Sequence, residues 1–266
     1  MSDIDSAGLV AVVGNVSRDV VAGAPPRPGG AVFHAARALV REGVQARIVT
    51  RCSADDVEGL LRPLEELGLP VAFRTGASTT AFTFRYEGDH RVMHVDSVGD
   101  PWTVADVAGW VADALEDVTW VQVGALLRSD FDSPSLAALA GSGRRLLVDA
   151  QGLVRVARVG PLTRDADVDP AAFASLTALK LNEDEARILA GGTEPDALRG
   201  LGVPEIVVTL GSAGALAVTS ATAERIPAVD VGPVSDPTGA GDAFSAVYLV
   251  SRARGAEPVE AARAAN

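Results

Sequence analysis

The placement of short apolar segments along the chain is the feature that most restricts its fold. Segments rich in aliphatic residues, typical of strands buried inside a sheet, lie at 9–13, 46–50, 120–124, 146–149 and 178–181. Longer segments that predict helices lie between or after them, at 31–40, 54–67, 102–115, 240–252 and 259–265. Strands that alternate with helices in this way favour a mostly parallel sheet covered by helices.

The composition excludes several classes of protein. The net charge is −12, and no stretch rich in Lys or Arg is present that could follow a phosphate backbone, so we expect no nucleic-acid partner. No apolar segment is long enough to span a bilayer, and no segment has the pattern of a secretion signal, so we expect no membrane partner. The one cysteine, Cys52, excludes an intramolecular disulfide and favours a reducing, cytoplasmic location.

The chain contains a single lysine, Lys180, which limits its chemistry. No glycine loop precedes this residue, so a Walker A phosphate loop is absent. Schiff-base or pyridoxal chemistry would depend on Lys180 alone, and the residues that follow it point to a different role.

A polar, glycine-rich segment at 236–242 leads directly into the predicted helix 240–252. Gly239 and Gly241 lack the Cβ atoms that would keep an anion away from the backbone, and the first N–H groups of a helix have no partners of their own. Because a carboxylate would repel a resting phosphate, Asp242 at this place suggests a base that accepts a proton from an attacking hydroxyl. The alternative is a helix cap in which Asp242 only binds backbone N–H groups.

The segment Asp-Pro-Thr-Gly-Ala-Gly-Asp at 236–242 resembles the C-terminal signature of the ribokinase-like, or pfkB, carbohydrate kinases. The resemblance implies a single domain over 1–266 with the family's fold, a three-layer α/β/α sandwich with a mostly parallel central sheet. It implies that the backbone of Gly239, Ala240 and Gly241 stabilises the transferring phosphoryl group. It also implies that Asp242 is the general base and that ATP and Mg²⁺ are the cofactors.

The N-terminal part of the chain supplies the residues that the resemblance assigns to the acceptor. Asp19, in a loop after the first strand, holds substrate hydroxyls in the family. Gly29 and Gly30 resemble the family's N-terminal Gly-Gly signature and permit close approach to a ligand. His34 stands where ribokinase has asparagine, which argues against assuming ribose. Its two interpretations are a substrate ligand and a helix histidine partly buried beside Phe33.

The small sheet that covers the active site in the family is expected to be reduced here. Only a few residues separate Asp19 from Gly29, so that half of the lid is expected to be absent or vestigial. Residues 80–95 still alternate like a β-hairpin with a turn and are the candidate remaining lid. This hairpin would be either a minimal cover or the surface of a homodimer. His90 and His94 within it have no third ligand in view, so no metal site is predicted there.

Two further segments match the family residue by residue. Asn182 and Glu185 fit its Asn-x-x-Glu, associated with magnesium and phosphate; the same spacing also describes a capping box. Thr209, Gly211 and Gly214 fit its nucleotide-binding turn, although alone they would form an ordinary hairpin. Segment 149–155, from Asp149 to Arg155, is a weaker match at the expected ligand edge of the sheet.

These observations predict an ATP-dependent kinase that phosphorylates a hydroxyl of a sugar, nucleoside or cyclitol. A non-catalytic nucleotide- and sugar-binding sensor derived from the same fold is the first alternative. A dinucleotide-dependent oxidoreductase is the second and weaker one, because the third glycine of a dinucleotide fingerprint is missing. The sequence stops at Asn266, before the helix segment that walls the nucleotide base in the family, so the adenine pocket and any monovalent-cation site are expected to be incomplete.

Overall fold

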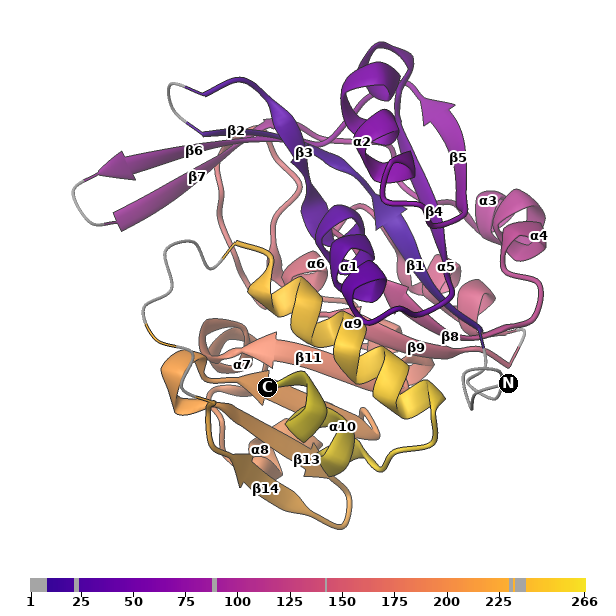
Figure 1. The fold of residues 1–266 in the computed structure, drawn as a ribbon. Helices are drawn as coiled ribbons and strands as arrows, with labels where there is room; N and C mark the ends of the chain where they lie inside the picture. The colour runs from indigo at the N-terminus through magenta and orange to yellow at the C-terminus, as the bar shows by residue number, and fades with distance from the viewer. Residues whose placement is uncertain (1–8, 22–23, 88–89, 142, 230–231, 233–237) are drawn as a thin grey trace.

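The computed structural model describes residues 9–21, 24–87, 90–141, 143–229, 232 and 238–266 (Figure 1). Asp236 and Pro237 of the glycine-rich segment and the hairpin turn at 88–89 lie outside the described residues. In the described part of the chain, a nine-stranded sheet has the order β14-β13-β12-β11-β9-β8-β1-β4-β5. Its strands are β1 (Leu9–Asn15), β4 (Ala46–Ser53), β5 (Val71–Gly76), β8 (Val118–Val123), β9 (Arg145–Asp149), β11 (Ala178–Asn182), β12 (Glu205–Thr209), β13 (Ala215–Thr219) and β14 (Ala223–Ile226).

The sheet is parallel from β5 to β12, and β13 and β14 add to it as antiparallel strands. Its helices and helical turns are α1 (Gly30–Arg41), η2 (Ala54–Asp56), η3 (Val57–Leu61), α2 (Arg62–Glu65), α3 (Val104–Asp106), η4 (Val107–Val111), α4 (Ala112–Ala114), α5 (Ser133–Ala140), α6 (Gln151–Val154), η5 (Pro170–Ser175), α7 (Glu183–Ala190), α8 (Pro195–Arg199), η6 (Gly211–Ala213), α9 (Ala240–Ala253) and α10 (Pro258–Ala265). The helices predicted at 54–67 and 102–115 are present as runs of short helical turns rather than continuous α-helices.

Two hydrophobic cores lie on opposite faces of the large sheet, as the alternation of strand side chains requires. On β1, Val10 and Val12 belong to the core under α1, α9 and α10, which Figure 1 shows on one face. Ala11 and Val13 belong to the other core, under α5, α7 and α8. The predicted three-layer α/β/α sandwich is therefore confirmed. Within the described residues, no helix has the length and apolar character needed to cross a membrane.

A second, five-stranded sheet projects from one end of the large one (Figure 1). Its order is β10-β7-β6-β2-β3, formed by β2 (Ser17–Val21), β3 (Arg27–Gly29), β6 (Ala81–Glu87), β7 (His90–Ser97) and β10 (Gly160–Pro161).

This small sheet corrects the expectation that half of it would be absent. The segment predicted as a loop around Asp19 is strand β2, which pairs with β6 on one side and with the three-residue β3 on the other. The chain passes from β1 to β2 with only Val16 between them. A short connection suffices because β2 and β3 are antiparallel neighbours, whereas sequence length alone suggested that there was no room for them.

Candidate active site

A cavity of about 300 Å³ lies where the small sheet meets the carboxyl ends of β9 and β11 and the start of α9. Ligands of open α/β sheets bind at this edge. The predicted site residues that line the cavity are Asp19, Gly30, His34, Asn182, Glu185, Gly239, Gly241 and Asp242. Segments that are more than 200 positions apart in the sequence therefore contribute to one site.

One side of the cavity is built by β2 and β3. The Ser17 hydroxyl donates to Asp19 Oδ1 at 2.7 Å, and Asp19 is almost fully buried. A Cβ atom on Gly29 would overlap the Asp19 carboxylate, so glycine is required there for the two strands to approach. Gly29 thus acts through Asp19 and does not itself line the cavity.

His34 on α1 contacts the glycine turn at the start of α9. A Cβ atom on Gly239 would lie 2.5 Å from His34 Nδ1, and Gly239 has a φ of +82°, so both space and backbone conformation favour glycine. The imidazole also meets the Phe33 ring edge-on, with ring centroids 5.9 Å apart. Both interpretations of His34 therefore describe part of its environment: it packs beside Phe33, and it faces the cavity.

Asp242 lies in the first turn of α9, inside the cavity. Burial raises the pKa of its carboxyl to about 7, and the negative charge of Asp149 adds to the effect. The positive charges of Lys180 and Arg155 oppose this rise. A carboxyl with such a pKa is suited to exchange a proton near neutral pH.

Lys180 and Asp149 form a buried ion pair in the same cavity, with Nζ 3.0 Å from Asp149 Oδ2. The two residues are register partners on the neighbouring strands β11 and β9. Burial disfavours the charge of Lys180, but Asp149 and Glu185 outweigh it and raise the lysine pKa. Lys180 is not among the site residues predicted from the sequence. A lysine inside an apolar strand was the available signal, because a buried lysine needs a carboxylate partner.

The carboxyl end of segment 149–155 also reaches the cavity. Arg155 lines it together with Gln151, and burial lowers the pKa of the Arg155 guanidinium. Its Nε atom is buried and has no hydrogen-bond partner among the described residues. The weaker sequence match at Asp149 and Arg155 therefore belongs to the site as well.

Asn182 and Glu185 form the capping box that the sequence left as an alternative. Glu185 Oε2 accepts from the Asn182 N–H at 2.9 Å, and Asn182 Oδ1 accepts from the Glu185 N–H at 2.9 Å. Burial, followed by the charge of Asp149, raises the pKa of Glu185. Because both residues also line the cavity, the cap does not exclude a ligand role.

The donor set fits a magnesium ion held largely through water. The cap uses one carboxylate oxygen of Glu185, and Oε1 has no hydrogen bond among the described residues. No cluster of three or more acidic, His or Cys side chains able to hold a metal directly occurs in the described part of the chain. Magnesium commonly binds to one or two protein oxygens and completes its shell with water and phosphate.

The residues predicted to bind the nucleotide line a second cavity of about 280 Å³. Thr209, Gly211 and Gly214 all lie in its wall, beside Ala240 and Gly241. Gly241 therefore borders both cavities, and the start of α9 lies between them.

Hydrophobic side chains of the small sheet complete the first cavity. Phe82 and Phe84 on β6 and Met93 on β7 face it, and Leu126 joins them from the loop after β8. Phe82 and Phe84 lie in the predicted hairpin, but no sequence signal identified Leu126. The opposite face of the hairpin carries polar contacts, such as the hydrogen bond between Thr83 and Asp96 at 2.5 Å.

The architecture is that of ribokinase-like kinases, as solved structures show. A pyrophosphate-dependent kinase of the ribokinase family, solved with a pyrophosphate analog and myo-inositol, matches with a TM-score of 0.79 and 24% identity over 96% of this chain and 92% of its own. Burkholderia thailandensis nucleoside kinase matches with a TM-score of 0.75 and 19% identity over 96% and 88%. Arabidopsis thaliana ribokinase matches with a TM-score of 0.74 and 18% identity over 98% and 90%.

The profile of the pfkB family carbohydrate kinases matches residues 11–266, and the chain belongs to this family. It is accordingly a kinase that uses a hydroxyl group as acceptor. The family predicted from the glycine-rich segment is confirmed, and the oxidoreductase alternative is wrong.

Proposed function

We propose that the protein transfers the terminal phosphoryl group of ATP to a hydroxyl of a small polyol, with Asp242 as the general base. The observation that carries the proposal is the position of Asp242 at the start of α9: it lines the cavity that contains Asp19 and follows Gly241, which borders both cavities. Asp19 would hold hydroxyls of the acceptor, and Asp242 would take the proton of the hydroxyl that attacks. The N–H groups of Gly239, Ala240 and Gly241, which have no acceptor within the helix itself, would stabilise the transferring group.

The lining of the first cavity supports a small ring with several hydroxyls, as in a sugar, nucleoside or cyclitol. Asp19, His34 and Asp242 supply polar groups on one side, whereas Phe82 and Phe84 supply an apolar surface on the other. The small sheet would then serve as a cover. Its outward face carries polar contacts, which give no support to the homodimer surface. The homodimer stays a prediction that a size measurement in solution can test. The cytoplasmic location stays a prediction that can be tested in the intact cell.

Thr209, Gly211 and Gly214 would bind the nucleotide, and Asn182 and Glu185 would hold magnesium through water. When bound, the ion would neutralise phosphate charge and align the donor. Pyrophosphate is a second candidate donor, because the structurally similar kinase solved with myo-inositol depends on pyrophosphate. Both ATP and pyrophosphate are therefore tested as phosphoryl donors.

The test measures phosphorylated product by mass spectrometry across sugars, nucleosides and inositols, with magnesium and either ATP or pyrophosphate. For an accepted substrate, Asp242→Asn should lower kcat by about 10²–10⁴-fold, the usual contribution of a positioned base, while ATP binding persists. The exposed carboxylate of Asp196 provides a matched control, so Asp196→Asn should leave kcat unchanged.

Full turnover by Asp242→Asn would refute the assignment of the base. ATP binding without turnover of any acceptor would favour the sensor. Turnover with pyrophosphate but not with ATP would support phosphoryl transfer to a hydroxyl, with pyrophosphate in place of ATP as the donor.

A further inference from the structure

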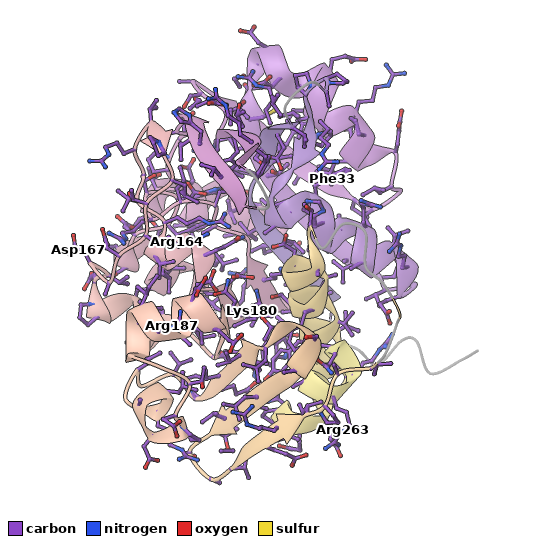
Figure 2. The ribbon with its side chains drawn as sticks, turned by 90° about the vertical axis from the view of Figure 1, so that its left-hand side faces the viewer. Phe33, Arg164, Asp167, Lys180, Arg187 and Arg263 are labelled. Carbon is purple, nitrogen blue, oxygen red and sulfur yellow. The ribbon has the colours of Figure 1, made fainter. Side chains whose placement is uncertain are left out.

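Lys180 lies directly beneath the glycine turn that separates the two cavities. A Cβ atom on Gly241 would lie only 2.6 Å from Lys180 Nζ, so the ammonium group is in contact with the backbone at the start of α9. In the view of Figure 2, Lys180 lies near the middle, between the helix that carries the labelled Arg187 and the yellow helix α9. The residue is only 5% exposed.

In the described part of the chain, one residue accepts a hydrogen bond from this ammonium group. An ammonium has three N–H donors, and among the described residues only Asp149 Oδ2 accepts one of them, at 3.0 Å. Lys180 also lines the cavity that contains Asp242, so an acceptor bound in this cavity can reach the ammonium group. A ligand with acceptor oxygens at this point would accept further hydrogen bonds from the ammonium group.

We propose that Lys180 is a catalytic residue whose ammonium group binds oxygen atoms of the phosphoryl group while it passes from donor to acceptor. The inference rests on the proposed phosphoryl transfer. It follows from position: Gly241 borders both cavities and lies against Lys180 Nζ, so a group that passes between the cavities comes close to the ammonium group. Asp149 is then a positioning residue that holds the ammonium in place.

In the step itself, the acceptor oxygen forms a bond to phosphorus and its proton goes to Asp242. The bond from phosphorus to the bridging oxygen of the donor breaks, and ADP leaves with the electron pair. Lys180 keeps its proton throughout and supplies a fixed positive charge where negative charge gathers. The competing explanation is that the ion pair only ties β9 to β11.

The variants must separate these two roles. Lys180→Met alone would leave Asp149 buried without a partner and would endanger the fold. The double variant Lys180→Met with Asp149→Asn removes both charges together, and Asp149→Asn alone is its matched control, because it retains the ammonium group. Thermal unfolding of all three establishes which of them are folded.

Two measurements then test the proposal. In the double variant, kcat should fall by about 10²–10³-fold, as when one preorganised donor is removed from an oxyanion site, with the acceptor KM unchanged. Binding of inorganic phosphate, measured by calorimetry, should weaken by at least about tenfold, which corresponds to one charged hydrogen bond. Asp149→Asn alone should bind phosphate as tightly as the wild type or more tightly, because it removes a negative charge.

A folded double variant with wild-type kcat and wild-type phosphate affinity would overturn the proposal and leave the pair a structural tie. Recovery of the full rate at high pH would also overturn it, because Lys180 would then act only by easing the ionisation of Asp242. Failure of the proposed function looks different. In that case the wild type turns over no acceptor, and phosphate binding by the wild type and the double variant still decides whether Lys180 contacts the anion.

Discussion

The Asp242 carboxyl shares its cavity with five other charged side chains from three segments: Asp19, Asp149, Arg155, Lys180 and Glu185. Burial and Asp149 raise its pKa to about 7, so a large fraction of the base is protonated below that pH. We therefore expect kcat/KM to rise with pH through about 7 and then level off. The measurement is a pH–rate profile with saturating magnesium.

The control for this profile is Asp149→Asn. Removing the neighbouring negative charge lowers the pKa of Asp242, so the acidic limb should move to lower pH even if the plateau rate changes. A profile that is flat between about pH 5.5 and 8 would contradict a base with a raised pKa.

Glu185 caps α7 and is proposed to hold magnesium, and a substitution can separate these two roles. Glu185→Gln retains an acceptor oxygen for the Asn182 N–H and so preserves most of the cap, but it removes the charge that would attract magnesium. The magnesium concentration needed for half-maximal rate should rise about 10–100-fold, with little change in melting temperature. Glu260→Gln, in the exposed capping box of α10, is the control and should alter neither. An unchanged magnesium requirement in Glu185→Gln would limit Glu185 to capping.

Among the helices and strands, α9 is central to the site because its first turn contains Gly241 and Asp242. A buried network attaches its other end to the sheet: Glu205 on β12 accepts from the Tyr248 hydroxyl at 2.7 Å and from Arg252 Nη2 at 2.6 Å. Glu205→Gln would leave the Arg252 charge without its partner, at a cost of about 3–5 kcal/mol in the free energy of unfolding. Tyr248→Phe should cost only about 1 kcal/mol.

Urea unfolding measures these differences. The exposed pair of Arg199 and Asp196 provides the comparison, because Asp196→Asn should cost under about 1 kcal/mol. If Glu205→Gln were no more destabilising than Asp196→Asn, the network would not be what attaches α9 to β12.

At the scale of the whole molecule, two buried carboxyls influence how stability depends on pH. Burial raises the pKa of Asp130 to about 7, although its Oδ2 accepts from the Leu126 N–H at 2.8 Å, and Asp242 is raised similarly. A carboxyl with a higher pKa in the folded state binds more protons when folded between about pH 4 and 7. The free energy of unfolding should therefore fall as pH rises through that range.

Urea unfolding at several pH values tests this expectation. Asp130→Asn cannot ionise and keeps an acceptor for Leu126, so its stability should depend less steeply on pH than that of the wild type. An identical slope in the variant would show that Asp130 does not ionise in this range.

Local patterns determined much of the structure. The alternation of Val10 and Val12 with Ala11 and Val13 places β1 between two cores, because side chains of a strand alternate between faces. The spacing of Asn182 and Glu185 predicted the capping box because all of its atoms come from one turn. The glycine-rich segment before α9 likewise contains its own helix start and its own carboxylate.

Only the tertiary structure brought Lys180 to Asp149 and under Gly241, and only it revealed that β2 pairs with β6. These contacts join segments 30 or more positions apart, and strand register and sheet order decide them. No short sequence pattern predicts which two buried charged side chains will form a pair. The sequence by itself therefore determined the fold class and the glycine turn at the start of α9, whereas the ion pair beneath that turn and the small sheet beside it depended on how distant strands meet.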